Sequence, residues 1–322
     1  MDREGEQKTL PGIKKLKYAP KGKKTRSKLD NRLTIVGLFL VTVLGSLFFY
    51  LKTEVPKSFR QFLEPRVISS LPGDGAYQSV IEKFEKATAG LQGSYGFYVS
   101  HLEDNLSYGI SEDQIFPAAS LIKLPVIFSL YQQAEDKKIN LEAKYSLKEE
   151  DKRGGAGIVQ SAPTGTVYTY RKLAELMGNQ SDNTAFNVLV QILGEDQIGV
   201  TISNLGMRKT SLKKNETTPK EMGLFFERLL KGEILTPEHQ EEILGFLTKT
   251  AFEDRIPAGV PENIRVAHKI GTDARTFSDA GVVFAEKPFI LVIMSKDAQE
   301  TEALEVLPKI TQIVWELEVG SP

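Results

Sequence analysis

The chain of 322 residues contains no cysteine, only three histidines and a single tryptophan. The absence of cysteine excludes disulfide bonds, thiolate metal sites and a cysteine nucleophile. The histidines, at positions 101, 239 and 268, do not show the spacing of metal ligands, so we expect neither a metal site nor another cofactor. A Gly-x-Ser-x-Gly sequence is also missing, which argues against an esterase that relies on histidine.

Charge is distributed unevenly along the chain, although the formal net charge is only −1. Residues 1–32 hold eleven lysines and arginines and four acidic residues, a net charge of +7, which leaves −8 for the rest of the chain. A basic segment of this kind, interrupted by proline and glycine, predicts a disordered cytoplasmic tail. Such a tail either marks the membrane topology or lies against anionic lipid. The acidic remainder argues against a nucleic-acid partner.

A long hydrophobic run follows this tail. Leu33–Leu51 contains no charged residue, and a helix of this length at ~1.5 Å per residue spans about 28 Å, close to the thickness of a bilayer core. Because no small-residue cleavage site closes the run, it predicts an uncleaved transmembrane anchor. Lysine and arginine precede it, so we expect a single-pass protein of the cell membrane with its N-terminus in the cytoplasm and its main domain outside. Residues 52–75, with several prolines and glycines, predict a stalk.

Residues 76–318 show strand patterns near both ends and helix patterns between them. Apolar alternation predicts strands at Tyr95–Leu102, Leu106–Ile110, Ile264–Ile270, Ala280–Phe284 and Phe289–Met294. Helical periodicity predicts helices at Ala76–Ala89, Leu121–Ala134, Tyr170–Met177, Asn183–Leu193, Pro219–Leu230, Pro237–Leu247 and Ala298–Leu317.

These patterns predict an α+β fold. The simplest closure is a five-stranded antiparallel sheet built from residues 76–115 and 262–318, with the two terminal helices flanking it. Residues 116–261 then form an inserted, all-helical part. We expect a pocket at the seam between the sheet part and the helical part.

Ser120 and Lys123 stand three residues apart at the start of an apolar run. In a helix that begins near Ala118, both side chains lie on one face. A neutral amine next to a serine hydroxyl can take its proton, which turns the serine into a nucleophile without a histidine. The spacing alone is weak evidence, because Ser211 and Lys214 repeat it in a polar segment that favours a surface loop.

Two further short stretches strengthen the interpretation. Ser181-Asp182-Asn183 lies at a loop-to-helix junction, and Lys269-Ile270-Gly271-Thr272 ends a predicted strand. Together with Ser120-x-x-Lys123, this ordered set resembles the three active-site motifs of class A β-lactamases and penicillin-binding proteins. The resemblance covers roughly Tyr77 to Leu317, and it extends to Pro163–Met177, Thr217–Met222 and Asp279–Val283.

The resemblance implies a role for each motif residue. Ser120 is the expected nucleophile, Lys123 the proton acceptor, and Ser181 the relay of that proton to the leaving nitrogen. For Lys123 to act as a base it must be neutral, and burial together with the nearby Lys269 cation is expected to lower its pKa. The remaining members of the motifs are expected to bind the substrate: Asn183, Lys269, Gly271 and Thr272.

Three of the motif residues also carry backbone roles by resemblance. The amides of Ser120 and Thr272 are expected to form an oxyanion hole, and Gly271 is expected to let the substrate approach the strand edge. Structural explanations remain open for single residues. Ser181 is also a good N-cap for the following helix, and His268 is more often a packing residue than a base.

The sequence departs from the family in two places. The segment Leu205–Pro219 is about a dozen residues shorter than the loop of class A β-lactamases. It also lacks the Glu-x-x-Leu-Asn stretch that activates the deacylating water. Glu216 is the only carboxylate in this segment, and we interpret it as a structural clamp. In addition, Ile270 replaces the threonine of Lys-Thr-Gly, a loss that Thr272 on the same strand face is placed to compensate.

Three hypotheses for function follow. The first is a membrane-anchored β-lactamase-like serine hydrolase that forms an acyl-enzyme with β-lactams and releases it slowly. The second is a penicillin-sensitive D-alanyl-peptidase that acts on the stem peptide of peptidoglycan. The third is an ectodomain without catalysis that binds wall peptide. We expect a monomer in each case.

Overall fold

The computed structural model describes residues 74–320 apart from residues 105 and 233. The predicted tail (1–32), the predicted anchor (33–51) and nearly all of the predicted stalk (52–75) lie outside these residues. Within the described part of the chain, no helix combines the length and the hydrophobicity needed to cross a membrane.

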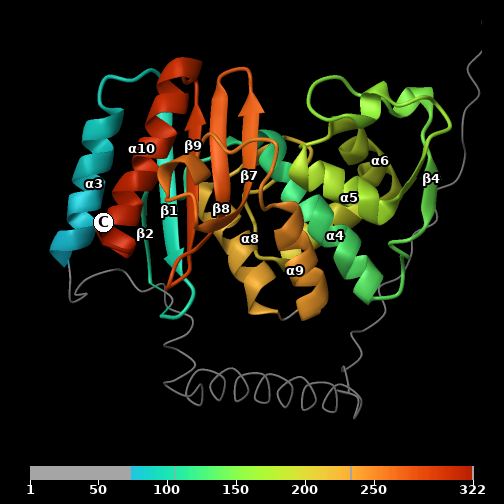
Figure 1. Cartoon of the computed structure of the whole chain (residues 1–322), viewed down its shortest axis with the longest axis horizontal. Coiled ribbons are helices and arrows are strands. Elements are labelled where there is room, and N and C mark those ends of the chain that lie inside the picture. Colours follow the sequence, from blue (N-terminus) through green and yellow to red (C-terminus); the bar gives the residue numbers. More distant parts are fainter. Residues whose placement is uncertain (1–73, 105, 233, 321–322) are drawn as a thin grey trace, which may run out of the picture. The chain divides into compact units, whose positions relative to one another are not determined.

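A five-stranded antiparallel sheet forms the centre of the described structure (Figure 1). The strand order is β2-β1-β9-β8-β7, so the first and last parts of the chain meet at the β1–β9 pair. The sequence therefore predicted the five strands and the closure from both ends correctly. The strands are β1 (Ser94–His101), β2 (Ser107–Ile110), β7 (Arg265–Asp273), β8 (Thr276–Phe284) and β9 (Phe289–Lys296).

Helices cover both faces of this sheet. The terminal helices α3 (Asp74–Thr88) and α10 (Glu300–Glu318) pack together on one face, where Phe84, Leu307 and Leu291 of β9 belong to one hydrophobic cluster. On the other face Val292 of β9 belongs to the core of the helical part. Because successive strand residues point to opposite sides, β9 supplies both cores at once.

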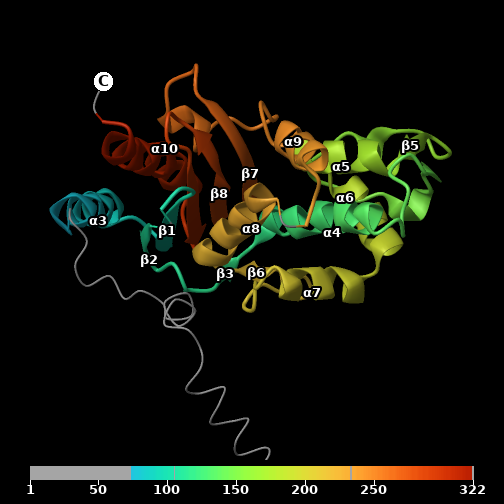
Figure 2. The same ribbon diagram turned by 90° about the horizontal axis from the view of Figure 1, so that it is seen from below.

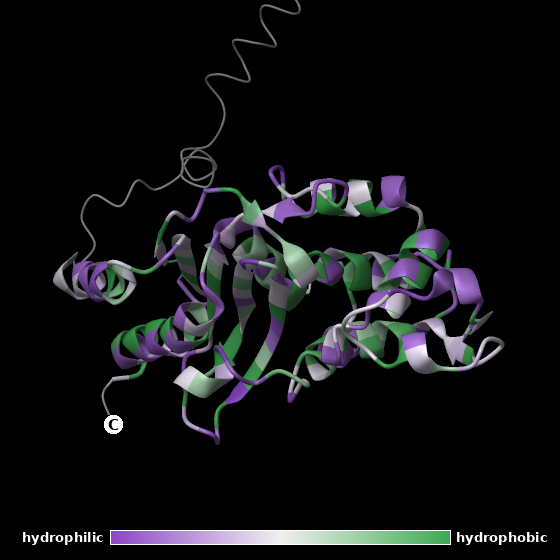
Figure 3. Ribbon diagram, turned by 90° about the horizontal axis from the view of Figure 1, so that it is seen from above, coloured by the Kyte–Doolittle hydropathy of each residue, from purple (hydrophilic) through white to green (hydrophobic). Residues whose placement is uncertain are grey.

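The helical part is built around α4 (Lys123–Glu135), whose residues from Lys123 to Tyr131 are all buried. Figure 2 shows this helix between its neighbours, and Figure 3 shows that the helices have a polar and an apolar side. Burial of the apolar sides stabilises the bundle by roughly 25 cal/mol per Å² removed from water. The surrounding helices are α5 (Tyr170–Asn179), α6 (Asn183–Leu193), α7 (Glu195–Asn204), α8 (Pro219–Lys231) and α9 (Pro237–Phe246).

Three features of this part were not predicted from the sequence. Helix α7 was missed, and so were two short antiparallel ribbons. One ribbon pairs β3 (Phe116–Pro117) with β6 (Glu216–Thr217), and the other pairs β4 (Lys144–Ser146) with β5 (Val167–Thr169). Strands of two or three residues are too short to show a period, so only their tertiary partners define them. The β3–β6 ribbon ties the chain just before Ser120 to the start of α8.

A titratable contact joins the β1–β2 hairpin to the C-terminal helix. His101 Nε2 lies 2.8 Å from Glu318 Oε2, and the Tyr108 hydroxyl donates to Glu318 Oε1 at 2.7 Å. The hydrogen bond to Glu318 raises the pKa of His101 above its usual value of 6.5, against the opposing effect of burial.

We expect this contact to make unfolding depend on pH. A raised histidine pKa contributes stability that is complete below pH 6.5 and is lost as the pH rises through the folded-state value. When the pH is raised from 6 to 8, the melting temperature of the full-length wild-type protein should therefore decrease. The decrease should be smaller in the His101→Gln variant. Calorimetry measures this, and an equal change of melting temperature with pH in the two proteins would contradict the assignment. His239→Gln is the control, because it replaces a histidine elsewhere in the fold.

Candidate active site

Ser120 lies in a single 3-10 turn, Ala119–Ile122, between β3 and α4. We predicted that a helix begins near Ala118 and places Ser120 and Lys123 on one side. The tighter turn does this, because residues i and i+3 are eclipsed in a 3-10 helix. Ala119 has a φ of 47°, a strained value for a residue with a side chain, and such strain is common where a fold holds a functional group in place.

Gly271 allows strand β7 to approach this turn closely. A Cβ atom at position 271 would lie 2.9 Å from the carbonyl oxygen of Ala118 and 3.1 Å from Leu121 Cγ. Any larger side chain would push the strand away from the nucleophile turn. Close packing therefore requires glycine at position 271. The substrate-binding role predicted for Gly271 from the sequence is a separate matter.

The Lys123 amine lies at the meeting point of three motif residues. Its Nζ is 3.0 Å from Ser120 Oγ, 2.6 Å from the Ser181 carbonyl oxygen, 3.2 Å from Ser181 Oγ and 2.6 Å from Asn183 Oδ1. The side chain is only 2% exposed. Burial lowers the pKa of Lys123 to about 8, although the nearby Asp182 carboxylate opposes the shift. A minor but appreciable fraction of this amine is therefore neutral near physiological pH, as a proton acceptor requires.

Asp182, not Ser181, caps helix α6. Its carboxylate accepts hydrogen bonds from the amides of Ala185 at 2.9 Å and Val159 at 2.8 Å. The side chain is fully buried, and a Cβ at Gly157 would lie 2.1 Å from its Oδ2. The alternative that Ser181 serves as the N-cap is thus wrong. The Ser181 hydroxyl is free to face Lys123, from a backbone held at a φ of 55°.

Lys269 is buried on β7 and approaches the site from the sheet. Burial, and then repulsion from Lys123, lowers the pKa of Lys269 well below its usual value. Its amine donates to the carbonyl of Ile270 at 3.2 Å. Lys269 therefore lies within electrostatic reach of Lys123. In the described structure, however, it forms no hydrogen bond to Ser120 or Ser181.

A cavity of about 380 Å³ opens beside Ser120. Ser181 and Ala156 line it from the helical part, while Ile270 and Thr272 line it from β7. The predicted pocket at the seam is therefore present, and Ser120 and Thr272, the two predicted oxyanion-hole residues, lie on the same cavity. The other lining residues are Phe252, Asp254, Arg255, Phe277, Glu300 and Leu304.

Arg255 is a site residue that the sequence analysis missed. It is 3% exposed and donates to the carbonyls of Gly271 at 3.0 Å and Ser278 at 2.6 Å, and to the Thr272 hydroxyl at 2.6 Å. Burial lowers the pKa of Arg255, but a guanidinium remains charged at any physiological pH. No motif or periodic pattern surrounds this arginine in the sequence, so only its position in space identifies it.

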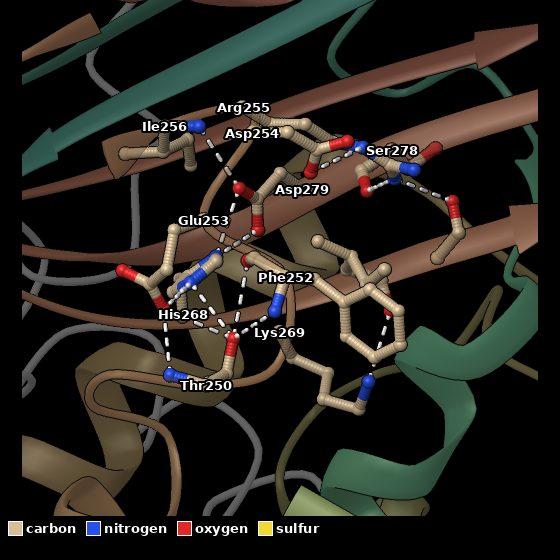
Figure 4. A network of polar contacts seen from close by, with 12 residues as sticks. Thr250, Phe252, Glu253, Asp254, Arg255, Ile256, His268, Lys269, Ser278 and Asp279 are labelled. Carbon is tan, nitrogen blue, oxygen red and sulfur yellow. Dashed lines mark hydrogen bonds and ion pairs between the residues drawn. The ribbon is translucent and has the colours of Figure 1, made fainter. Parts of the chain in front are cut away.

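His268 is buried, as its predicted packing role implies, but it is also ion-paired. Its Nδ1 lies 2.8 Å from Asp279 Oδ1, and its Nε2 lies 3.3 Å from Glu253 Oε1 (Figure 4). Burial acts to lower the pKa of His268, but the two carboxylates outweigh it and raise the pKa to about 9. Among the described residues, no group of three or more histidine, aspartate or glutamate side chains is arranged to hold a metal ion.

The shortened loop is held by a different glutamate from the one expected. The Glu221 carboxylate accepts from the Lys209 amide at 2.8 Å and from the Thr210 hydroxyl at 2.6 Å. Glu216, the clamp expected from the sequence, instead contributes backbone pairing, with Ser211 and with Pro117 of β3. Neither glutamate lines the cavity beside Ser120.

Because Ser181 and Asp182 have different partners, their replacement by alanine should affect the stability of the protein differently. Asp182→Ala should lower the free energy of unfolding by about 1–3 kcal/mol, because it removes a helix cap and leaves two buried amides unpaired. Ser181→Ala should leave stability nearly unchanged, since its hydroxyl contacts only the Lys123 amine. Urea denaturation of both variants checks this, and a larger loss of stability for Ser181→Ala would contradict the assignment of the cap.

Comparisons with known proteins agree with this geometry. The family model described as "Beta-lactamase enzyme family" matches residues 78–317. Beta-lactamase VEB-1 of Pseudomonas aeruginosa is 22% identical over 263 aligned residues, which cover 72% of this chain and 88% of that protein. Beta-lactamase 3 of Bacillus cereus is 23% identical and covers 72% of this chain and 79% of its own length.

Solved structures show the same fold. The beta-lactamase of Sphaerobacter thermophilus superposes with a TM-score of 0.72 at 24% identity, over 76% of this chain and 98% of that one. PBP-A gives a TM-score of 0.70 at 24% identity, over 75% and 94% of the two chains. A mutant of PBP-A in an acyl-enzyme complex with penicillin G gives 0.70, over 76% and 96%. This chain belongs to the beta-lactamase enzyme family of serine hydrolases.

Proposed function

We propose that the protein is a membrane-anchored enzyme that forms an acyl-enzyme on Ser120 with β-lactams or related amides and releases it slowly. The observation that carries this proposal is the arrangement of hydrogen bonds around the Lys123 amine. The family match and the PBP-A acyl-enzyme with penicillin G support the choice of substrate class.

A neutral Lys123 amine has two N–H donors and one lone pair. The Ser181 carbonyl and Asn183 Oδ1, both 2.6 Å away, can only accept, so they take the two donors. The lone pair is then left for the Ser120 hydroxyl at 3.0 Å. The surrounding acceptors thus orient the amine as a base toward the nucleophile.

The acylation step follows from these contacts. Ser120 Oγ bonds to the amide carbonyl carbon of the substrate, and its proton passes to Lys123 Nζ. The carbonyl oxygen becomes the oxyanion of a tetrahedral intermediate. When this intermediate collapses, the C=O bond forms again and the C–N bond breaks. The proton returns from Lys123 through the Ser181 hydroxyl, 3.2 Å away, to the leaving nitrogen. The products of the step are an ester on Ser120 and a free amine, which in a β-lactam stays attached.

Arg255 supplies a positive charge, and Thr272 a hydroxyl donor, for a substrate carboxylate. Because the Thr272 oxygen accepts from the guanidinium at 2.6 Å, its own hydrogen is free to point into the cavity as a donor. This pair offers a carboxylate site on the strand where Ile270 lacks the hydroxyl of the family motif. We therefore propose that Thr272 replaces the hydroxyl that is missing at Ile270, and that Arg255 holds the Thr272 hydroxyl in place for this role.

The proposal of slow deacylation rests on which carboxylates line the cavity, because a carboxylate activates the deacylating water in class A β-lactamases. Those lining the cavity come from Asp254 and Glu300, and none comes from residues 205–216, where class A β-lactamases have the glutamate of their water-activating loop. The same feature favours the second candidate, a penicillin-sensitive D-alanyl-peptidase that acts on peptidoglycan. A binding domain without catalysis is less well supported, because Ser120 and its base are in contact.

The membrane anchor is proposed from the sequence alone. The uncharged run Leu33–Leu51 and the eleven basic residues before it support a cytoplasmic N-terminus and an external catalytic domain. We expect the full-length protein to sediment with membranes and to resist extraction with alkaline carbonate. A variant lacking residues 1–51 should be released into the soluble fraction, and membrane association of this variant would contradict the anchor.

Intact-mass spectrometry with penicillin G tests the enzymatic proposal. The wild-type protein should gain the mass of one penicillin, and Ser120→Ala should gain none, because the nucleophile is lost. Ser211→Ala is the matched control, since Ser211 belongs to the second Ser-x-x-Lys sequence, and it should be labelled like wild type. A wild-type protein that takes no label would support the binding-domain alternative and would contradict both enzymatic candidates.

Turnover then separates the two enzymatic candidates. Hydrolysis of nitrocefin over many turnovers would identify a β-lactamase and would contradict slow deacylation. A stable adduct without turnover, together with release of D-alanine from a peptidoglycan stem peptide, would identify the peptidase.

A further inference from the structure

The segment 250–256 forms one wall of the cavity beside Ser120, and it has no regular secondary structure. It supplies Phe252, Asp254 and Arg255 to the cavity lining. A segment of this kind needs specific anchors to hold a side chain such as Arg255 in one place. Figure 4 shows that the anchors converge on the paired side chains of His268 and Asp279.

Both ends of the segment are tied to the His268–Asp279 pair. At its end, the Ile256 amide donates to Asp279 Oδ2 at 3.0 Å, immediately after Arg255. At its start, His268 Nε2 faces Glu253 Oε1 at 3.3 Å and Thr250 Oγ1 at 3.4 Å. Glu253 in turn accepts from the Thr250 amide at 2.6 Å, which closes the turn.

The sheet is shaped to hold this imidazole. His268 on β7 pairs with Gly281 on β8, where a Cβ would lie 2.6 Å from the His268 Cβ. The missing side chain leaves room for the ring beside Asp279, two residues away on the same face of β8. Both His268 and Asp279 are completely buried. A buried carboxylate without a charged donor would be strongly destabilising.

Only the charged imidazole satisfies both ends of the segment. An imidazolium has two N–H donors, one for Asp279 and one for Glu253, whereas a neutral ring has one donor and one lone pair. In the neutral form, one carboxylate would face a lone pair, and that end of the segment would lose its anchor. The other charged groups nearby are Arg255, beside Asp279, and Lys269, whose side chain extends toward Lys123.

We propose that the His268 imidazolium is a positioning residue that holds segment 250–256, and with it Arg255, against the cavity where a substrate carboxylate binds. His268 touches neither Ser120 nor Lys123, so its effect is on recognition of the carboxylate and not on activation of the nucleophile. This inference rests on the proposed acylation of Ser120 by β-lactams.

The pH dependence of acylation distinguishes this role from a packing role. The rate should rise as Lys123 loses its proton near pH 8, and it should fall again as His268 loses its proton near pH 9. The sign follows because the raised pKa of His268 keeps the anchoring form in place below about pH 9 and removes it above. In His268→Gln, the rise should remain and the fall should disappear.

Because a buried histidine is a risky site for mutation, Glu253→Ala provides the main test: it removes the acceptor that faces His268 and the Thr250 amide. We compare the rate of Ser120 acylation by penicillin G with that by its methyl ester, which lacks the carboxylate, in the full-length protein. Glu253→Ala should lower the preference for the acid over the ester about tenfold, since a small displacement of Arg255 weakens only the carboxylate contact. Glu262→Ala, which removes an exposed carboxylate outside this network, should keep the wild-type preference.

Two outcomes would overturn the proposal. One is an unchanged preference in Glu253→Ala, and the other is an equal loss of rate with acid and ester, which would indicate general disruption. Nitrogen NMR of the three histidines gives a reading that does not depend on activity. His268 should remain an imidazolium at pH 8, and a neutral ring at this pH would contradict the proposal. If penicillin labels no wild-type protein, the proposed function fails, and the NMR result still decides the charge of His268.

Discussion

The site depends on one buried amine, that of Lys123, which two separate parts of the chain surround. Lys123 begins the central helix α4, and the 3-10 turn before it presents Ser120. Ser181 comes from the loop before α6, and Asn183 is the first residue of that helix. Burial makes this amine a weaker base than an ordinary lysine, and a proton acceptor near neutral pH needs such tuning. The surrounding acceptors then fix the direction of its lone pair. Without the contact to Lys123, the Ser120 hydroxyl would have no base to take its proton.

The fold supports this contact from two sides. Strand β7 brings Lys269 and Gly271 to the nucleophile turn on one face, and its other face carries Thr272 and holds His268 in the ion-paired network. The same strand thus connects the acylation chemistry with the segment that carries Arg255. Backbone strain at Ala119 and Ser181 is concentrated at the site, where the packed surroundings hold both residues in unfavourable conformations.

The sequence predicted what regular patterns and ordered motifs encode. The five strands, the terminal helices and the meeting of Ser120, Lys123, Ser181 and Asn183 were all predicted from periodicity and motif order. Asp182 could not be distinguished from Ser181 as the helix cap, because both residue types cap well and only Gly157 makes room for the aspartate. Arg255 lies in an irregular segment without a motif, so its role arises from contacts with strands far along the chain. The membrane anchor stays a prediction.

The titration of Lys123 itself tests the central claim most directly. In protein with carbon-labelled lysine side chains, the Lys123 Cε signal can be identified by its loss in Lys123→Met and then followed by NMR against pH. The account predicts a midpoint near pH 8. A midpoint at or above the ordinary lysine value of 10.5 would contradict it, because the amine would then be charged whenever the enzyme acts.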